Sequence, residues 1–380
     1  MTATQWLEVL LSFSLQVFVV ILASSALERW LVKPADRCSI WSTCFVSILV
    51  LGSAGLLLPR LHLLRPWVFA EPETLIAAAA VERRIAEALV SVWCIGATFA
   101  IAKWMLRGVL LRRSVKHCEQ LPPEQVRELL GPSRRLRSED ELPTVLISDR
   151  ADGPYCFQLH QATIVVPRLL LDGTRDDLRN VLFHELAHLR GNHPVQLFLQ
   201  QLAHVICWFH PAVWRASARA SLMREYTCDD AVVDEGVKCA AYLRTLLRIA
   251  ERNEHLSQQG AIAFGRTPTE LMLRAKRLVE LAQGKQAVTR GIQSLGKPAA
   301  VAILLTVTCV MTQVTIPSDP MSSSRTAWST WPTWSAQCLH CFGVTVRDYE
   351  LFDRRVRPYE QLFDGGGGET RFVEPGAQSP

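Results

Sequence analysis

The sequence lacks a strong excess of charge of either sign. It has 41 lysine and arginine residues against 36 aspartate and glutamate residues, which leaves a formal net charge of only +5. Such a mild balance indicates neither a nucleic-acid-binding protein nor an acidic, heavily solvated one. Charge therefore says little about partners until the positions of the basic residues are considered.

Paired cysteine spacing is almost absent. Of the 11 cysteines, only Cys338 and Cys341 form a CxxC pair, and no second CxxC accompanies them. We therefore expect this pair to form a disulfide or to have no function, rather than to be half of a zinc knuckle. Five cysteines of the central segment show no paired spacing, as expected of reduced thiols: Cys118, Cys156, Cys207, Cys228 and Cys239.

Long apolar runs, by contrast, are plentiful. Hydrophobic residues make up 49% of the chain, and the mean hydropathy is +0.14. Four segments are apolar enough to cross a bilayer as helices of about 20 residues: 6–27, 38–58, 88–110 and 298–316. The first lacks a basic n-region and an A-x-A-like cleavage site, and a second span follows closely. This favours a membrane anchor over a cleaved signal peptide.

Basic residues beside the spans predict the orientation. Arg29, Lys33 and Arg37 lie between the first two spans, and Arg112 and Arg113 follow the third. Loops rich in such residues stay in the cytoplasm, although four arginines in the 59–87 loop oppose this assignment. We predict a multi-pass protein of the inner (cytoplasmic) membrane whose N-terminus lies outside.

The predicted spans divide the chain into four parts. Residues 1–111 form a membrane region with three spans, 112–297 a cytoplasmic domain, 298–316 the fourth span, and 317–380 a flexible extracytoplasmic tail rich in Ser, Pro and Gly. In the cytoplasmic domain we expect strands at 142–149 and 160–167. Helices are expected at 176–190, 194–208, 211–236, 240–254 and 269–281.

The string HELAH at 184–188 is a candidate metal site. Residues four apart share one face of a helix, so His184 and His188 can direct both imidazoles to one ion. Glu185 can then hold a water acidified by zinc, take its proton as general base, and deliver it to the leaving amine. The alternative is a helix with two unrelated histidines, because HExxH also arises by chance.

A catalytic zinc site needs a third protein ligand. The metzincin pattern places a histidine six residues after His188, but Pro194 occupies that position and His193 falls one short. Further on, Glu225 and Asp229 stand four residues apart on a predicted helix. A carboxylate there can complete the ligand set, while Asp229 can accept a hydrogen bond from a ligand imidazole. The alternative is that both are solvated surface acids.

Several longer strings occur in a distinctive order: GPYCFQLHQATIVVP, FHELAHLRGNHP, WFHPAVW and EYTCDDAVV. Together they resemble the BlaR/MecR family of membrane zinc metallopeptidases, over roughly residues 149–233. The later string LMLRAKRL at 271–278 is also similar. The resemblance implies a mainly α membrane protein with four transmembrane helices. A cytoplasmic α+β, zincin-like (gluzincin-type) peptidase domain would lie between the third and fourth helices.

The resemblance also implies roles for individual residues. It implies one Zn²⁺ per chain, held by His184, His188 and Glu225, with Glu185 as the base and Asp229 supporting a ligand. It further implies that the run Ile164, Val165 and Val166 is an edge strand, to which a substrate could add as a further strand.

The chain departs from the family pattern near its C-terminus. Sensor-type members carry a large penicillin-binding domain after the fourth span. Here only residues 317–380 follow, and they contain no S-x-x-K or K-T-G string. We therefore expect no β-lactam sensor domain in this chain.

The leading hypothesis is a zinc metalloendopeptidase that acts in signal transduction by cleaving a cytoplasmic transcriptional repressor, without itself binding nucleic acid. One alternative is a membrane quality-control protease similar to the HtpX type. Another is a non-catalytic membrane signalling or scaffold protein with a structural metal site. Glu185 speaks against the last, because a structural site needs no general base.

Overall fold

The computed structural model of the chain describes residues 3–59, 72–131, 142–149, 151, 153–158, 161–257, 268–283, 296–316, 333–344 and 346. The described part is mainly helical and includes one four-stranded sheet. Most of the tail predicted at 317–380 lies outside the described residues. Within that tail the structure has a helix, α12 (Thr333–Cys341), in which Cys338 and Cys341 are exposed free thiols.

Three helices are long and apolar enough to cross a membrane: α1 (Ala3–Glu28), α2 (Pro34–Leu57) and α3 (Pro72–Val115). Pro34 begins α2, as expected of a proline whose missing N–H would be unpaired at a helix start. The third helix begins 16 residues before the predicted span at 88–110, because alanine and glutamate in the preceding segment favour helix. Helices α1 and α2 bury a shared apolar core.

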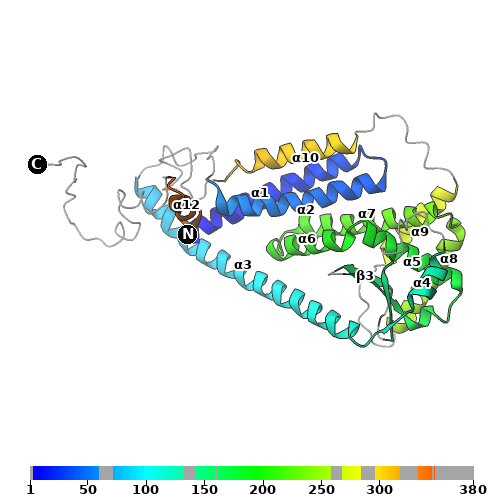
Figure 1. Cartoon of the computed structure of the whole chain (residues 1–380). Coiled ribbons are helices and arrows are strands. Elements are labelled where there is room, and N and C mark those ends of the chain that lie inside the picture. Colours follow the sequence, from blue (N-terminus) through cyan, green and yellow to red (C-terminus); the bar gives the residue numbers. More distant parts are fainter. Residues whose placement is uncertain are drawn as a thin grey trace, which may run out of the picture.

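The fourth predicted span forms a shorter helix, α10 (Lys297–Met311), of 15 residues. It packs against α1 and α2, where the Thr308 hydroxyl donates to Ser47 Oγ at 3.0 Å. Just beyond it, the Ile316 N–H donates to Ser12 Oγ in α1 at 2.9 Å. This segment therefore belongs with the candidate spans, as Figure 1 shows, while a complete fourth crossing stays a prediction.

The sheet is small and mixed. Its strands are β1 (Glu119–Gln120), β2 (Thr144–Ser148), β3 (Tyr155–Gln158) and β4 (Ala162–Pro167), in the order β1-β2-β4-β3. The strand β4 pairs in parallel with β2 and antiparallel with β3.

The prediction that Ile164, Val165 and Val166 form an edge strand is therefore wrong. These three side chains are completely buried, in a strand with a neighbour on each side. A continuous apolar run is typical of a strand covered on both faces, and pairing with β2 and β3 puts β4 inside the sheet. The edge strand beside β4 is β3, in a segment for which the sequence had predicted no strand.

Five helices complete the region between the third candidate span and α10, which we call the peptidase region: α5 (Arg175–Arg190), α6 (His193–Ile206), α7 (Pro211–Asp234), α8 (Cys239–Ser257) and α9 (Pro268–Ala282). All five lie within a few residues of their predicted ranges. The side chain of Thr174 caps α5 by accepting from the Asp177 N–H, whereas Asp176 and Asp177 lie in the first turn, where negative charge favours the helix dipole.

The hairpin of α6 and α7 lies alongside the candidate spans (Figure 1). At its tip, the indole N–H of Trp93 in α3 donates to the Ile206 carbonyl at 3.0 Å, and that of Trp208 donates to the Trp93 carbonyl at 3.3 Å. His210 Nε2 lies 3.2 Å from the Ser14 carbonyl oxygen, near the middle of α1. Part of the segment predicted to be cytoplasmic thus packs among the span helices.

Candidate metal centre

Two neighbouring helices bring three metal-binding side chains to one point. His184 and His188 lie one turn apart on α5, and Glu225 faces them from α7. The two Nε2 atoms are 3.3 Å apart. Glu225 Oε2 lies 3.3 Å from His184 Nε2, and Glu225 Oε1 lies 3.4 Å from His188 Nε2.

These separations fit a tetrahedral zinc ion. Zinc binds histidine nitrogen and carboxylate oxygen at about 2.0–2.2 Å, so two donors at a tetrahedral angle stand about 3.3–3.5 Å apart. All three donor pairs of the candidate site fall at 3.3–3.4 Å. Two imidazoles and one carboxylate are also a donor set typical of catalytic zinc.

The protonation state of His184 suits metal binding. Burial lowers the pKa of His184, and only a neutral imidazole has a lone pair for a metal. Its Nδ1 lies 2.9 Å from the hydroxyl of Tyr242 in α8, and that hydroxyl donates to Asp229 Oδ1 at 2.8 Å. Within this chain of hydrogen bonds His184 donates through Nδ1, which leaves the Nε2 lone pair directed at the metal position.

Asp229 thus supports His184 mainly through Tyr242. Its Oδ1 is 3.6 Å from His184 Nδ1, longer than a hydrogen bond. The sequence placed Asp229 correctly on the face of α7 that carries Glu225, but it gave no sign of the tyrosine between them. Tyr242 is buried, and its position depends on how α8 packs against α5.

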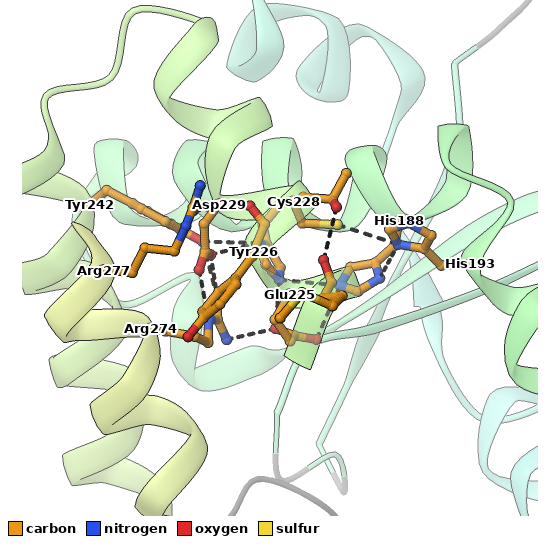
Figure 2. Close-up of polar contacts among 12 residues, drawn as sticks. His188, His193, Glu225, Tyr226, Cys228, Asp229, Tyr242, Arg274 and Arg277 are labelled. Carbon is orange, nitrogen blue, oxygen red and sulfur yellow. Dashed lines mark hydrogen bonds and ion pairs between the residues drawn. The ribbon is translucent and has the colours of Figure 1, made fainter. Parts of the chain in front are cut away.

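A buried arginine lies behind the carboxylates. Figure 2 shows Arg274 extending from α9 between Asp229 and Glu225. Its Nε donates to Asp229 Oδ2 at 3.0 Å, and its Nη2 donates to Asp229 Oδ1 at 2.6 Å. Its Nη1 lies 2.7 Å from Glu225 Oε2. Although burial alone would lower it, the pKa of Arg274 is raised well above its usual value by these two carboxylates.

His188 has a separate partner on its other side. Its Nδ1 lies 2.9 Å from Nδ1 of His193, which in turn lies 3.5 Å from Cys228 Sγ (Figure 2). Burial, with the nearby His188, lowers the pKa of His193 to about 3, so His193 stays neutral and its Nδ1 can accept a hydrogen bond from the Nδ1–H of His188. The sequence had predicted no role for His193, which falls one position short of the metzincin histidine.

The turn between α5 and α6 allows His193 to contact His188. Asn192 adopts a left-handed backbone conformation, with φ of 52°, and turns His193 back towards α5. A Cβ on Gly191 would lie 2.5 Å from His193 Nε2, so glycine leaves the space that the imidazole occupies.

Glu185 lies beside the ligands on the buried side of α5. The thiol of Cys156 in β3 is within hydrogen-bonding reach of its carboxylate, and burial together with this negative charge raises the pKa of Cys156. The edge strand β3 therefore runs next to the candidate base. Cys156 carried no sequence signal, because its neighbours gave no strand pattern.

Comparison with known proteins agrees with this geometry. Residues 69–276, more than half of the chain, match the family described as BlaR1 peptidase M56. The chain is 23% identical over 154 residues to the regulatory protein BlaR1 of Bacillus licheniformis, covering 40% of this chain and 25% of that protein. It is 25% identical over 114 residues to the methicillin resistance mecR1 protein of Staphylococcus aureus, covering 30% of this chain and 17% of that protein.

Proposed function

Because the chain belongs to the BlaR1 peptidase M56 family, we propose that it is a membrane zinc endopeptidase in which His184, His188 and Glu225 hold the metal and Glu185 is the general base. The observation that carries this proposal is the equal spacing of the three donors, at 3.3–3.4 Å. Three protein ligands leave a fourth tetrahedral position open, as catalytic zinc requires.

Each residue of the chain then has a defined task. Zinc, when bound, supplies a Lewis acid that acidifies the attacking water and polarises the scissile carbonyl. Glu185 accepts a proton from that water and passes it to the leaving amine. Tyr242 and His193 fix the orientation of the two imidazoles. Arg274 balances the charge of Glu225 and Asp229, so that both can stay ionised inside the domain.

The substrate is proposed to bind along β3. Among the described residues this strand pairs only with β4, so its other edge is open to a further strand. Main-chain hydrogen bonds to such an edge hold a peptide in extended form without requiring a particular sequence. The contact of Cys156 with Glu185 puts that peptide next to the candidate base.

The proposed biological role is the release of gene expression by cleavage of a cytoplasmic transcriptional repressor. Support comes from the name of the relative described as a regulatory protein and from the candidate spans, which would keep the peptidase at a membrane face. The chain matches a quarter or less of the length of the two relatives named above. Cleavage of a repressor by this chain is therefore part of the proposal.

The test compares wild-type protein with Glu185→Gln in the parent cells, by mass spectrometry of protein N-termini. Loss of the base is expected to reduce cleavage roughly 10²–10⁴-fold, while zinc content stays at about one ion per chain. His184→Ala should lose both zinc and cleavage. Asp176→Asn, an exposed acid on the same helix, is the matched control and should keep both.

The outcomes separate the alternative functions. A single DNA-binding protein cleaved only in wild-type cells supports the repressor hypothesis, whereas many cleaved membrane proteins would indicate quality control instead. Unchanged signalling by Glu185→Gln protein with full zinc content would show that the metal is structural and that the protein is not acting as a peptidase.

A further inference from the structure

A pocket lies beside the first half of α7, before the part of this helix that carries Glu225. Its volume is about 620 Å³, and it is formed by the later half of α1, the start of α2 and the start of α7. We call it the α1–α7 pocket. None of its lining residues belongs to the candidate metal site, and the proposed peptidase mechanism gives it no role.

The polarity of the α1–α7 pocket changes along its length. One part is apolar and includes Phe18 and Leu22 of α1, which are 49% and 59% exposed, together with Ala212 and Ala216 of α7. The other part is basic: Arg29 and Arg37 lie near Glu28, where the candidate span α1 ends, and Arg215 and Arg219 are two further arginines from α7. With α1 as a membrane span, the apolar side chains would face lipid hydrocarbon, and the long arginine side chains could reach the headgroups.

Among the described residues that line this pocket, Glu28 is the only acid, and its charge is already compensated. Arg219 Nη2 lies 2.7 Å from Glu28 Oε1, and the indole N–H of Trp41 donates to Glu28 Oε2 at 3.2 Å. Arg37 donates through Nε to the Leu31 carbonyl at 2.8 Å, which positions its guanidinium without neutralising it. The basic part therefore keeps a surplus of positive charge.

From this arrangement we infer that the α1–α7 pocket is a binding site for one anionic phospholipid. The phosphate lies among Arg29, Arg37 and Arg215, and an acyl chain lies over Phe18 and Leu22. A soluble phosphate would leave the apolar part uncovered, and a zwitterionic headgroup would leave the surplus charge unbalanced. Guanidinium groups suit phosphate because their N–H donors form paired hydrogen bonds with its oxygens.

The position of the pocket links lipid binding to the peptidase region. Arg219 and Glu225 lie on the same helix, α7, less than two turns apart. A lipid that touches α1, α2 and α7 together adds contacts only when these helices are assembled. Bound anionic lipid should therefore raise the unfolding temperature of the protein, by linkage to the folded state.

The experiment uses the full-length protein in a neutral detergent, with native mass spectrometry to count retained lipids. Dioleoyl-phosphatidylglycerol and dioleoyl-phosphatidylcholine, which share the same acyl chains, are added separately. Wild-type protein should retain one phosphatidylglycerol in preference to phosphatidylcholine. The variant Arg29→Gln/Arg215→Gln should bind phosphatidylglycerol roughly 30-fold more weakly, since each arginine near the surface contributes about fivefold. Both arginines are exposed, so the substitutions remove no buried contact.

The matched control is Arg112→Gln/Arg113→Gln, which removes two exposed arginines from the end of α3, outside the pocket. It should retain phosphatidylglycerol as wild-type protein does, with the same rise in unfolding temperature. Equal retention of both lipids, or equal weakening by the control, would overturn the inference. So would displacement of phosphatidylglycerol by an equal concentration of glycerol 3-phosphate, because that would indicate a site for free anions.

Discussion

Arg274 is the residue on which the charge balance of the candidate metal centre depends. It is completely buried and contacts the carboxylates of Asp229 and Glu225. Removing one partner of a buried charge network leaves the others desolvated and unpaired, at a cost of about 3–5 kcal/mol. Its role is positioning, since it holds Glu225 in the orientation that brings both carboxylate oxygens near the histidines.

The variant Arg274→Gln is therefore expected to lower the free energy of unfolding by about 3–5 kcal/mol and to weaken zinc binding. Denaturant unfolding and zinc analysis by mass spectrometry measure the two effects. The control is Arg277→Gln on the same helix, because Arg277 pairs at 2.6 Å with the partly exposed Asp230. An equal loss of stability in both variants would contradict a special role for Arg274.

Tyr242 gives a prediction about metal affinity rather than folding. The variant Tyr242→Phe keeps the ring but removes the hydroxyl that joins His184 to Asp229. Loss of such a supporting hydrogen bond typically reduces metal affinity about 10–100-fold. Competition for zinc with a chelator measures the change. Tyr226→Phe is the control, because the ring of Tyr226 packs on Arg277, and the zinc affinity of this variant should match wild type.

At the scale of single elements, Asp177 connects α5, the helix that carries His184 and His188, to α8. Its carboxylate accepts hydrogen bonds from the hydroxyls of Thr245, at 2.6 Å, and Thr174, at 2.7 Å, and it pairs with Arg248. Burial alone would raise the pKa of Asp177, but these contacts lower it below the usual value. The contacts therefore stabilise the ionised form of the folded protein.

An aspartate whose pKa is lowered by folding stabilises the folded protein at pH values above the pKa of the unfolded chain, about 3.9. This stabilisation is lost as the pH falls through the pKa of the folded state. Asp177→Asn should thus lower the free energy of unfolding by about 2 kcal/mol at pH 7. The difference should shrink steadily below pH 4, as followed by unfolding at several pH values. Asp176→Asn, exposed in the same turn, should change little; a pH-independent loss for Asp177→Asn would count against the ionic contribution.

The strands show which features of the sheet the sequence pattern could predict. The apolar run in β4 identified a strand correctly, and the ends of β2 and β4 were placed within two residues. The same run could not reveal which strands would become its neighbours. The edge is formed by β3, a four-residue segment with no alternating pattern. Strand order depends on contacts between distant segments, which local periodicity does not record.

At the scale of the whole molecule, the α6–α7 hairpin joins the peptidase region to the candidate spans. Its tip packs against α3, where a Cβ on Gly96 would lie 2.1 Å from Cε2 of the Trp208 ring. Such a distance forces the rigid ring to move, and the indole hydrogen bond of Trp208 to Trp93 would be disturbed.

Gly96→Ala is accordingly expected to lower the unfolding temperature of the purified protein by several degrees, because the added methyl separates α3 from the hairpin. Gly108→Ala on the same helix is the matched control, since nothing lies within 4 Å of its added Cβ. That substitution should be neutral or slightly stabilising, as alanine favours helix over glycine. If both variants behaved alike, the close packing at Trp208 would not matter for stability.

The sequence by itself determined the features that follow from spacing along one element. The four-residue interval of His184 and His188 puts both on one helix face, and prolines and glycines mark the helix boundaries near 191–194 and 211. Hydropathy likewise identified the three long apolar helices. The ordered motifs indicated the family that the comparison then showed.

Only the tertiary structure decided how separate elements meet. It brought Glu225 of α7 to the two histidines, inserted Arg274 between two carboxylates, and set the α6–α7 hairpin against the spans. These contacts join residues from 37 to nearly 200 positions apart. Their formation depends on shape and charge complementarity between whole surfaces, and no local stretch of the sequence encodes that complementarity.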